Sequence, residues 1–190
     1  GFLTAAADHI VHARDTLAPD LRDAARIVFT AHSVPTAMAG ALSYRRQLEA
    51  SAAEVARRLG VDDWALVFQS RSGRPEDPWL EPDVNDYLRA EHARGRLRAV
   101  ILSPIGFVCD HIEVLYDLDH EARATCDAIG LPMARASAVN AHPAFVETMA
   151  DMVQRTWETY RRGVPLTLVH PDRPNAAELP PPVRPKGRTQ

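Results

Sequence analysis

The sequence predicts a doubly wound α/β domain in which helices flank a mostly parallel, four-stranded sheet. Segments with apolar residues at helical spacing alternate with short β-rich apolar runs, an order typical of parallel strands joined by helical crossovers. The runs expected to be strands are almost continuously apolar, which indicates that helices cover both faces of the sheet. An apolar content of 46% is ordinary for a domain with a buried core.

The first half of the chain contains a helix, a strand, a second helix and a second strand. Residues 2–17 carry apolar side chains at helical spacing, and residues 26–32 form a short β-rich run. Residues 42–59 are expected to form a helix that ends at Gly60, and residues 64–69 the second strand. The apolar face of the second helix is expected to consist of Leu42, Leu48, Ala52, Val55 and Leu59.

The second half of the chain continues the alternation. Asp83 is the expected N-cap of a third helix, which ends near Gly95. Pro143 suits the first turn of the last helix. The remaining elements are a strand at 97–103, a helix at 111–130, a weak strand at 132–136 and the last helix at 143–161.

Composition also bounds the domain organisation. Residues 1–162 are expected to form the α/β domain, and residues 163–190 an extended or disordered tail because they are rich in proline. The chain begins at Gly1 without an initiator methionine, and we expect it to be a piece of a longer protein.

Charge and cysteine content exclude several classes of partner. The net charge is −3 and basic residues are not clustered, so neither nucleic acid nor an anionic membrane surface is an expected partner. No run of 18 apolar residues is present, so no integral membrane segment is expected. Two cysteines, Cys109 and Cys126, suit a reducing compartment, and we expect a cytoplasmic protein. Cys109 is expected to be a buried packing residue.

Polar and titratable residues follow the expected strands at the point where each strand ends. His32-Ser33 follows the first strand and Gln69-Ser70 the second, whereas Asp110-His111 comes shortly after the third and Asn140 to His142 after the fourth. The carboxyl ends of parallel strands meet at one edge of the sheet, where ligands bind. The sequence therefore predicts a functional site at this edge.

An acidic row follows the third strand. Glu113, Asp117 and Glu121 are spaced four residues apart, so an α-helix would place them on one face in a row about 12 Å long. Like charges at this spacing disfavour the helix, and a row of hard oxygen ligands suits a divalent metal ion in transit. The alternative is a solvated acidic face near a helix N-terminus, where the dipole favours acids.

Four other residues are candidates for the site. His32 is either a functional residue that points into the expected cleft or a core histidine bonded to backbone. Asp110 and His111 are expected to support the site, with His111 orienting its neighbours through Asp110 or the backbone instead of binding metal. Trp79 either lines a pocket or pins its loop to the core.

Several chemistries lack their motifs. The sequence contains no Gly-x-Gly-x-x-Gly after the first strand and no phosphate loop, so nucleotide binding is not expected. It also contains no Gly-x-Ser-x-Gly elbow and no Cys-x-x-Cys zinc pattern.

Three stretches resemble motifs of the ferrochelatases. Val-Phe-Thr-Ala-His-Ser-Val-Pro at residues 28–35 resembles the family's Ser-Ala-His-Ser-Leu-Pro. The second stretch resembles the family's Gln-Ser motif at Phe68-Gln-Ser-Arg and its Pro-Trp-Leu-x-Pro motif in the loop Asp77-Pro-Trp-Leu-Glu-Pro-Asp-Val. The sequence of this loop is most similar to that of the bacterial enzymes that metallate coproporphyrin III. The stretch from Phe107 to Asp117 is similar to the family's signature segment.

The resemblance implies a chelatase-like, Rossmann-type domain that is the second of two, with the N-terminal half of the same protein missing. The implied activity is insertion of ferrous iron, as a substrate, into a porphyrin. The implied site has His32 and Glu113 at the point of metal insertion and proton abstraction. Further metal contacts would come from Asp117 and Glu121, and porphyrin contacts from Ser70 and Trp79.

Two further expectations accompany the resemblance. Some actinobacterial members hold an iron-sulfur cluster through cysteines near the C-terminus, but no cysteine follows residue 126, so no cluster is expected. The alternatives to a ferrochelatase are a chelatase for another metal or tetrapyrrole, and a non-enzymatic haem- or metal-binding module.

Overall fold

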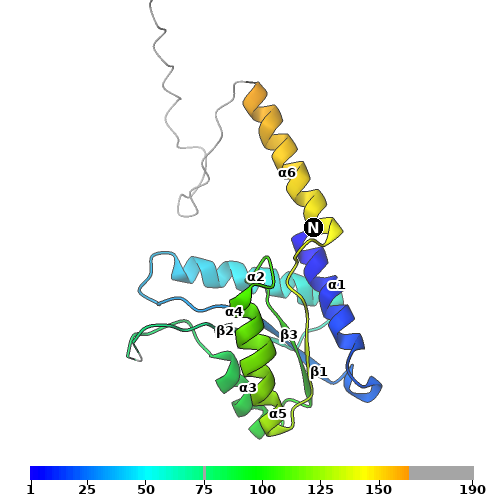
Figure 1. The fold of residues 1–190 in the computed structure, drawn as a ribbon, viewed down its shortest axis with the longest axis vertical. Helices are drawn as coiled ribbons and strands as arrows, with labels where there is room; N and C mark the ends of the chain where they lie inside the picture. Colours follow the sequence, from blue (N-terminus) through cyan, green and yellow to red (C-terminus); the bar gives the residue numbers. More distant parts are fainter. Residues whose placement is uncertain (75, 163–190) are drawn as a thin grey trace, which may run out of the picture. The chain divides into compact units, whose positions relative to one another are not determined.

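The computed structural model describes residues 1–74 and 76–162 (Figure 1). The chain divides into two compact units, Gly1–Thr148 and a second that begins at Met149. The expectation of an extended tail at 163–190 lies outside the described residues.

The first unit contains a four-stranded, fully parallel sheet in the order β2-β1-β3-β4. The strands are β1 (Ala25–His32), β2 (Trp64–Gln69), β3 (Ala99–Ser103) and β4 (Met133–Arg135). The predicted α/β class, the four strands and their parallel direction are therefore confirmed. The register pairs His32 with Gln69, so the carboxyl ends of β1 and β2 lie side by side.

Helices cover both faces of the sheet, because alternate residues of the central strand β1 enter two separate cores. Ile27, Phe29 and Ala31 pack with α1 (Phe2–Asp15) and α2 (Ala41–Leu59). Val28 faces the other core, which lies beneath the remaining helices of this unit (Figure 1). Those helices are α3 (Val84–Ala93), α4 (Ile112–Val114), η2 (Leu115–Ala122) and α5 (Arg123–Ile129). A short 3-10 turn, η1 (Pro19–Leu21), precedes β1, and α6 (Pro143–Arg161) follows β4.

Local signals set the helix ends as expected. The Asp83 carboxylate accepts hydrogen bonds from the backbone N–H groups of Asn85 and Asp86, at 2.8 and 3.2 Å, and so caps α3. Such a cap contributes about 1 kcal/mol. Gly60 ends α2 with a left-handed φ of 67°, which glycine adopts without steric cost.

The predicted single α-helix at 111–130 is wrong in its interior. Only α4 and α5 are α-helical, and η2 between them is a π-helix with i→i+5 hydrogen bonds. Residues four apart stay neighbours in either helix type, so the spacing of the acids could not distinguish the two. Two expectations of burial are also wrong: Leu42 is 71% exposed, and Cys109 is exposed because it lies in the loop beyond β3.

Gly106 brings the loop after β3 against the end of β1. Its N–H donates to the Thr30 carbonyl at 3.1 Å, and a Cβ at this position would lie 2.5 Å from the Ala31 Cβ. Only glycine permits this approach, which places the segment carrying Asp110 and His111 beside the strand that ends in His32.

Candidate functional site

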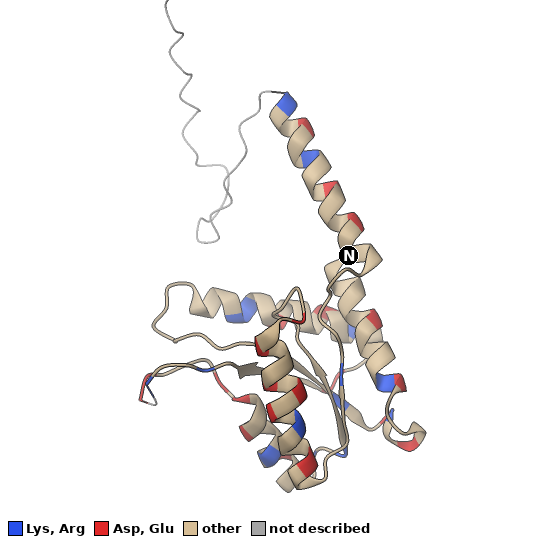
Figure 2. Ribbon diagram, in the orientation of Figure 1, with Lys and Arg blue, Asp and Glu red and all other residues tan. Residues whose placement is uncertain are grey.

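The predicted site residues gather at the carboxyl edge of the sheet, as the parallel topology requires. His32 ends β1, Ser70 follows β2, and Asp110 and His111 lie in the loop after β3. The acids Glu113, Asp117 and Glu121 lie on the helix that follows, where Figure 2 shows acidic positions along the ribbon.

His32 is half-buried and its ring nitrogen Nδ1 lies within hydrogen-bonding distance of the Ser33 carbonyl oxygen. A carbonyl only accepts, so Nδ1 carries the proton. In the neutral imidazole the other ring nitrogen, Nε2, then holds the lone pair, which can accept a proton or bind a metal ion. Tyr44 donates its hydroxyl to the His32 carbonyl at 3.1 Å and holds the backbone at this point.

Asp117 is held from the end of β2. Gln69 Nε2 donates to its carboxylate at 3.2 Å, and the Ser70 hydroxyl donates to the same oxygen. Ser70 has a left-handed φ of 61°, a conformation that costs a non-glycine residue of order 1 kcal/mol and that occurs often at functional sites. The end of β2 therefore binds the carboxylate of Asp117 on the neighbouring helix.

The other two members of the acidic row are more open. Glu113 and Glu121 are exposed, and neither carboxylate makes a hydrogen bond or ion pair within residues 1–74 and 76–162. In this same part of the chain, no group of three or more His, Cys, Asp or Glu side chains is arranged to hold a metal ion. The structure thus brings Asp117 to β2 but does not assemble His32 and the acids into a closed chelate.

Asp110 joins two loops at the site. Its carboxylate accepts from Arg135 Nη1 at 2.7 Å, from Asn140 Nδ2 at 2.8 Å and from the Ala138 N–H at 3.1 Å. Burial raises the pKa of Asp110, but the hydrogen bonds and the arginine outweigh it and leave the pKa below its ordinary value. Asp110 is therefore a charged anchor between the segments after β3 and β4.

His111 and Arg135 hold the helix that carries the acidic row. His111 is the N-cap of α4, and its Nδ1 accepts from the Glu113 N–H at 3.2 Å. Its partner is this backbone group, whereas the Asp110 side chain bonds elsewhere. Arg135 also donates to Asp119 on η2 at 2.7 Å, a contact that the sequence did not indicate.

Trp79 fixes the loop after β2 against the segment after β1. It pairs with Pro35 in an isolated β-bridge, and the Leu80 N–H donates to the Val34 carbonyl at 3.0 Å. The Trp79 indole N–H is buried and finds no acceptor among the described residues. The bridge supports one of the two roles considered for Trp79, which is to hold its loop against the core, over the other, which is to line a pocket.

Exposed apolar side chains flank the site, and sequence reasoning missed them. Met38 and Leu42 follow β1, whereas Val108, Ile112 and Tyr116 follow β3, with exposed fractions of 52–75%. Met38 and Val108 lie in loops, where large apolar residues are a signal that the sequence offered, whereas Leu42, Ile112 and Tyr116 lie in helices. Together they give this edge exposed apolar side chains, a feature that is typical of binding surfaces.

Comparison with known proteins identifies relatives of the chain. A family model described as Ferrochelatase matches residues 1–157. A protein of Rhodopirellula baltica named Ferrochelatase is 46% identical over 154 residues, which cover 81% of this chain and 44% of that protein. A Coproporphyrin III ferrochelatase of Mycolicibacterium vanbaalenii is 46% identical over 162 residues, which cover 84% of this chain and 46% of that protein.

The chain spans about half the length of the curated relatives it matches. A crystal structure of a multi-domain protein from Deinococcus radiodurans, described as similar to chelatases, aligns with 77% of this chain and 28% of its own. That alignment has a TM-score of 0.45 and 20% sequence identity.

Proposed function

The chain belongs to the ferrochelatase family, and from this premise we propose that residues 1–162 are the catalytic half of an enzyme that inserts ferrous iron into a porphyrin. The other half of the site would come from the part of the relatives' length that these 190 residues do not cover. The porphyrin and the ferrous ion are the two substrates, and the products are the metallated porphyrin and two protons.

The orientation of the His32 ring carries the proposal. Metallation replaces two pyrrole N–H protons with one divalent ion, so the site needs a base that can reach the ring nitrogens. The Ser33 carbonyl holds the proton on Nδ1 and leaves the Nε2 lone pair available. His32 thereby accepts a pyrrole proton or passes the metal ion to the ring, and imidazole is suited to proton transfer near neutral pH.

The acidic row supplies the second part of the chemistry. Glu113 acts with His32 at the point of insertion, whereas Asp117 and Glu121 continue the row along η2. Carboxylates that do not close into a chelate bind a hard divalent ion weakly, and weak contacts suit an ion that must be released to the porphyrin. The exposed positions of Glu113 and Glu121 leave them accessible to the ion and to the protons that leave.

The apolar edge supports a porphyrin as the second substrate. Met38, Leu42, Val108 and Ile112 present exposed apolar side chains on the segments after β1 and β3. A porphyrin has apolar faces and a carboxylate rim, so these side chains suit its faces. Ser70 completes the porphyrin side and acts also through Asp117, whereas Trp79 contributes by pinning the loop after β2.

Coproporphyrin III is the proposed porphyrin. The relatives from Mycolicibacterium and Streptomyces carry the name Coproporphyrin III ferrochelatase, and they are 43–53% identical to this chain. We place the enzyme in the cytoplasm, where Cys109 and Cys126 would stay reduced, and we propose no iron-sulfur cluster on this chain.

The experiment uses a chimera in which this chain replaces the matched 162 residues of the Mycolicibacterium vanbaalenii enzyme. Iron insertion into coproporphyrin III is followed by absorbance under anaerobic conditions. His32→Ala should lower kcat at least a hundredfold, because the base is lost. His12→Ala, an exposed histidine on α1, is the matched control and should leave turnover unchanged.

The same assay separates this function from its alternatives. Near-normal turnover by the His32→Ala chimera would refute the assignment of the base. Faster insertion of cobalt than of ferrous iron, or a preference for another tetrapyrrole, would replace the proposed substrates with those of a different chelatase.

A further inference from the structure

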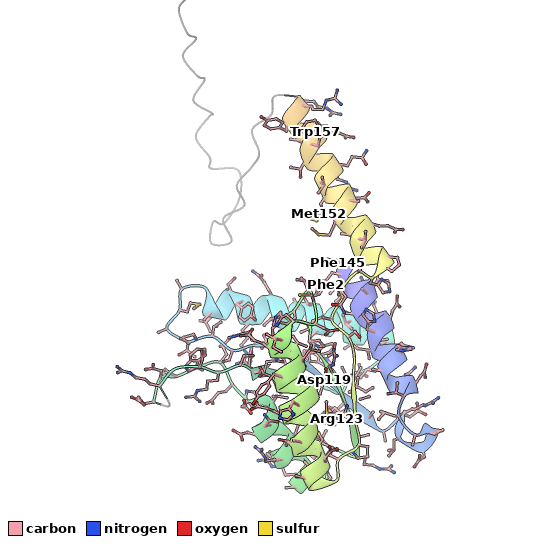
Figure 3. The ribbon with its side chains drawn as sticks, in the orientation of Figure 1. Phe2, Asp119, Arg123, Phe145, Met152 and Trp157 are labelled. Atoms are coloured by element: carbon pink, nitrogen blue, oxygen red, sulfur yellow. The ribbon has the colours of Figure 1, made fainter. Side chains whose placement is uncertain are left out.

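The second compact unit presents an apolar helix face that nothing described covers. Met149, Met152, Val153, Trp157 and Tyr160 are 46–66% exposed and recur at helical spacing on α6 (Figure 3 labels Met152 and Trp157). We call these five residues the α6 apolar face. With Thr156 they line a hollow of about 460 Å³.

The residue types of the α6 apolar face are those of a protein interface. Aromatic residues and methionine are enriched at the centres of such interfaces, and tryptophan and tyrosine contribute much of the binding energy. The Trp157 and Tyr160 rings stack with centroids 6.2 Å apart, so part of the face is already ordered for contact. A continuous exposed patch of this kind on a soluble helix marks a docking surface.

The charged residues of α6 favour a protein over a lipid surface as the occupant. Residues 143–162 contain three acids and three arginines and no lysine. Helices that lie in a membrane interface instead carry an excess of lysine and arginine on the polar face. The α6 helix is therefore amphipathic without the positive charge that anionic lipid would select.

The length of the relatives identifies the occupant. The family match runs to residue 157, so it includes most of α6 and every residue of its apolar face except Tyr160. The matched region is only 44–46% of two of the relatives' lengths, which leaves more than half of each protein to pack somewhere. We propose that the α6 apolar face docks against that uncovered half, so that α6 joins the two halves of the enzyme. This inference rests on the proposed two-half architecture, although not on its chemistry.

Hydrogen–deuterium exchange of the full chain alone and of the chimera tests the proposal without any activity measurement. Amides of residues 149–160 should exchange at least tenfold more slowly in the chimera than in the chain alone, because docking buries the helix. Amides of β1 and β3 are the internal reference and should be equally protected in both proteins.

Paired substitutions make the test independent of exchange rates. Trp157→Glu should leave the melting temperature of the chain alone unchanged, because Trp157 is already 57% exposed, and should lower that of the chimera by several degrees. Asp151→Asn, at an exposed charged position of the same helix, is the matched control and should be neutral in both.

Three results would overturn the docking proposal. The first is equal exchange of residues 149–160 in the two proteins, and the second is a neutral Trp157→Glu in the chimera. The third is a different occupant: a dimer of the chain alone that Trp157→Glu dissociates, or cosedimentation of the chain with anionic vesicles. A chimera that docks α6 but inserts no iron would instead refute the proposed function and leave this inference standing.

Discussion

Ser70 and Asp117, 47 positions apart in the sequence, share a hydrogen bond that ties the end of β2 to the π-helix η2. The contact depends on the left-handed backbone of Ser70 and on Gln69, which donates to the same carboxylate. It fixes Asp117, the middle member of the acidic row, to the sheet, and its loss should lower the free energy of unfolding.

Ser70→Ala should destabilise the chain by about 1–2 kcal/mol, because the Asp117 carboxylate loses a hydrogen bond while the backbone strain remains. Ser70→Gly should cost less, since glycine adopts a φ of 61° freely. Urea unfolding measures both, with Ser72→Ala in the exposed loop as the control. An equal effect of the alanine substitutions at positions 70 and 72 would contradict the role of this bond.

Gly106→Ala should destabilise the chain by about 1–3 kcal/mol, because the new methyl group would overlap Ala31. Ala31→Gly in the same chain should recover part of the loss by removing the facing Cβ. The double variant and both single variants are compared by thermal unfolding. A Gly106→Ala chain as stable as the parent would show that the loop after β3 moves aside without cost.

His9 should make the chain less stable in mild acid. Burial lowers the pKa of His9, the nearby His142 lowers it further, and opposing contributions from Val139, Asp110 and Asp8 do not restore it. A base with a lowered folded-state pKa binds fewer protons in the fold, so the unfolding free energy decreases as pH falls below about 6.5.

Denaturation of the parent and of His9→Phe between pH 7 and 5 measures this effect. The parent should lose stability over this range, and the variant should show a shallower slope because it cannot titrate. His12→Phe, at an exposed position of the same helix, should keep the parent's slope. Parallel curves for all three proteins would exclude His9 as the source.

Asp110→Asn should cost about 2 kcal/mol, since Arg135, Asn140 and the Ala138 N–H lose a charged acceptor. Because the fold lowers the pKa of Asp110, the carboxylate stabilises the fold at pH values above its ordinary pKa. This stabilisation is lost as the pH falls below about 4. Asp119→Asn removes the other Arg135 partner, on the more exposed side, and should cost less. The two variants are compared by urea unfolding at pH 7 and pH 3, where the cost of Asp110→Asn should shrink.

Patterns local in sequence predicted most of the fold. The apolar runs predicted β1 to β4. The capping residues Asp83 and Gly60 predicted the start of α3 and the end of α2. Parallel topology then predicts that His32, Ser70 and Asp110 lie at one edge of the sheet. These features follow from neighbouring residues and from general rules of chain connection.

Contacts between distant segments could not be predicted in the same way. Arg135 bridges Asp110 and Asp119, 25 and 16 positions away, and nothing near Arg135 in the sequence signals either partner. The π-helix was missed because its hydrogen bonds, and not its surface pattern, distinguish it. Leu42 is 71% exposed and Cys109 is exposed, and neither result could be predicted because exposure depends on the packing of distant segments.

The partner of the His32 ring is the main-chain carbonyl of Ser33, and this limits what a substitution at position 33 can change. Every residue that could replace Ser33 keeps that carbonyl, so substitution at position 33 cannot by itself remove the acceptor that selects the tautomer. The Ser33 hydroxyl has a separate task, because it donates to the Leu80 carbonyl at 2.8 Å. The position of the proton on the neutral His32 ring is therefore set by the path of the backbone, and substitutions at position 33 would report on the contact with Leu80 and not on the tautomer of His32.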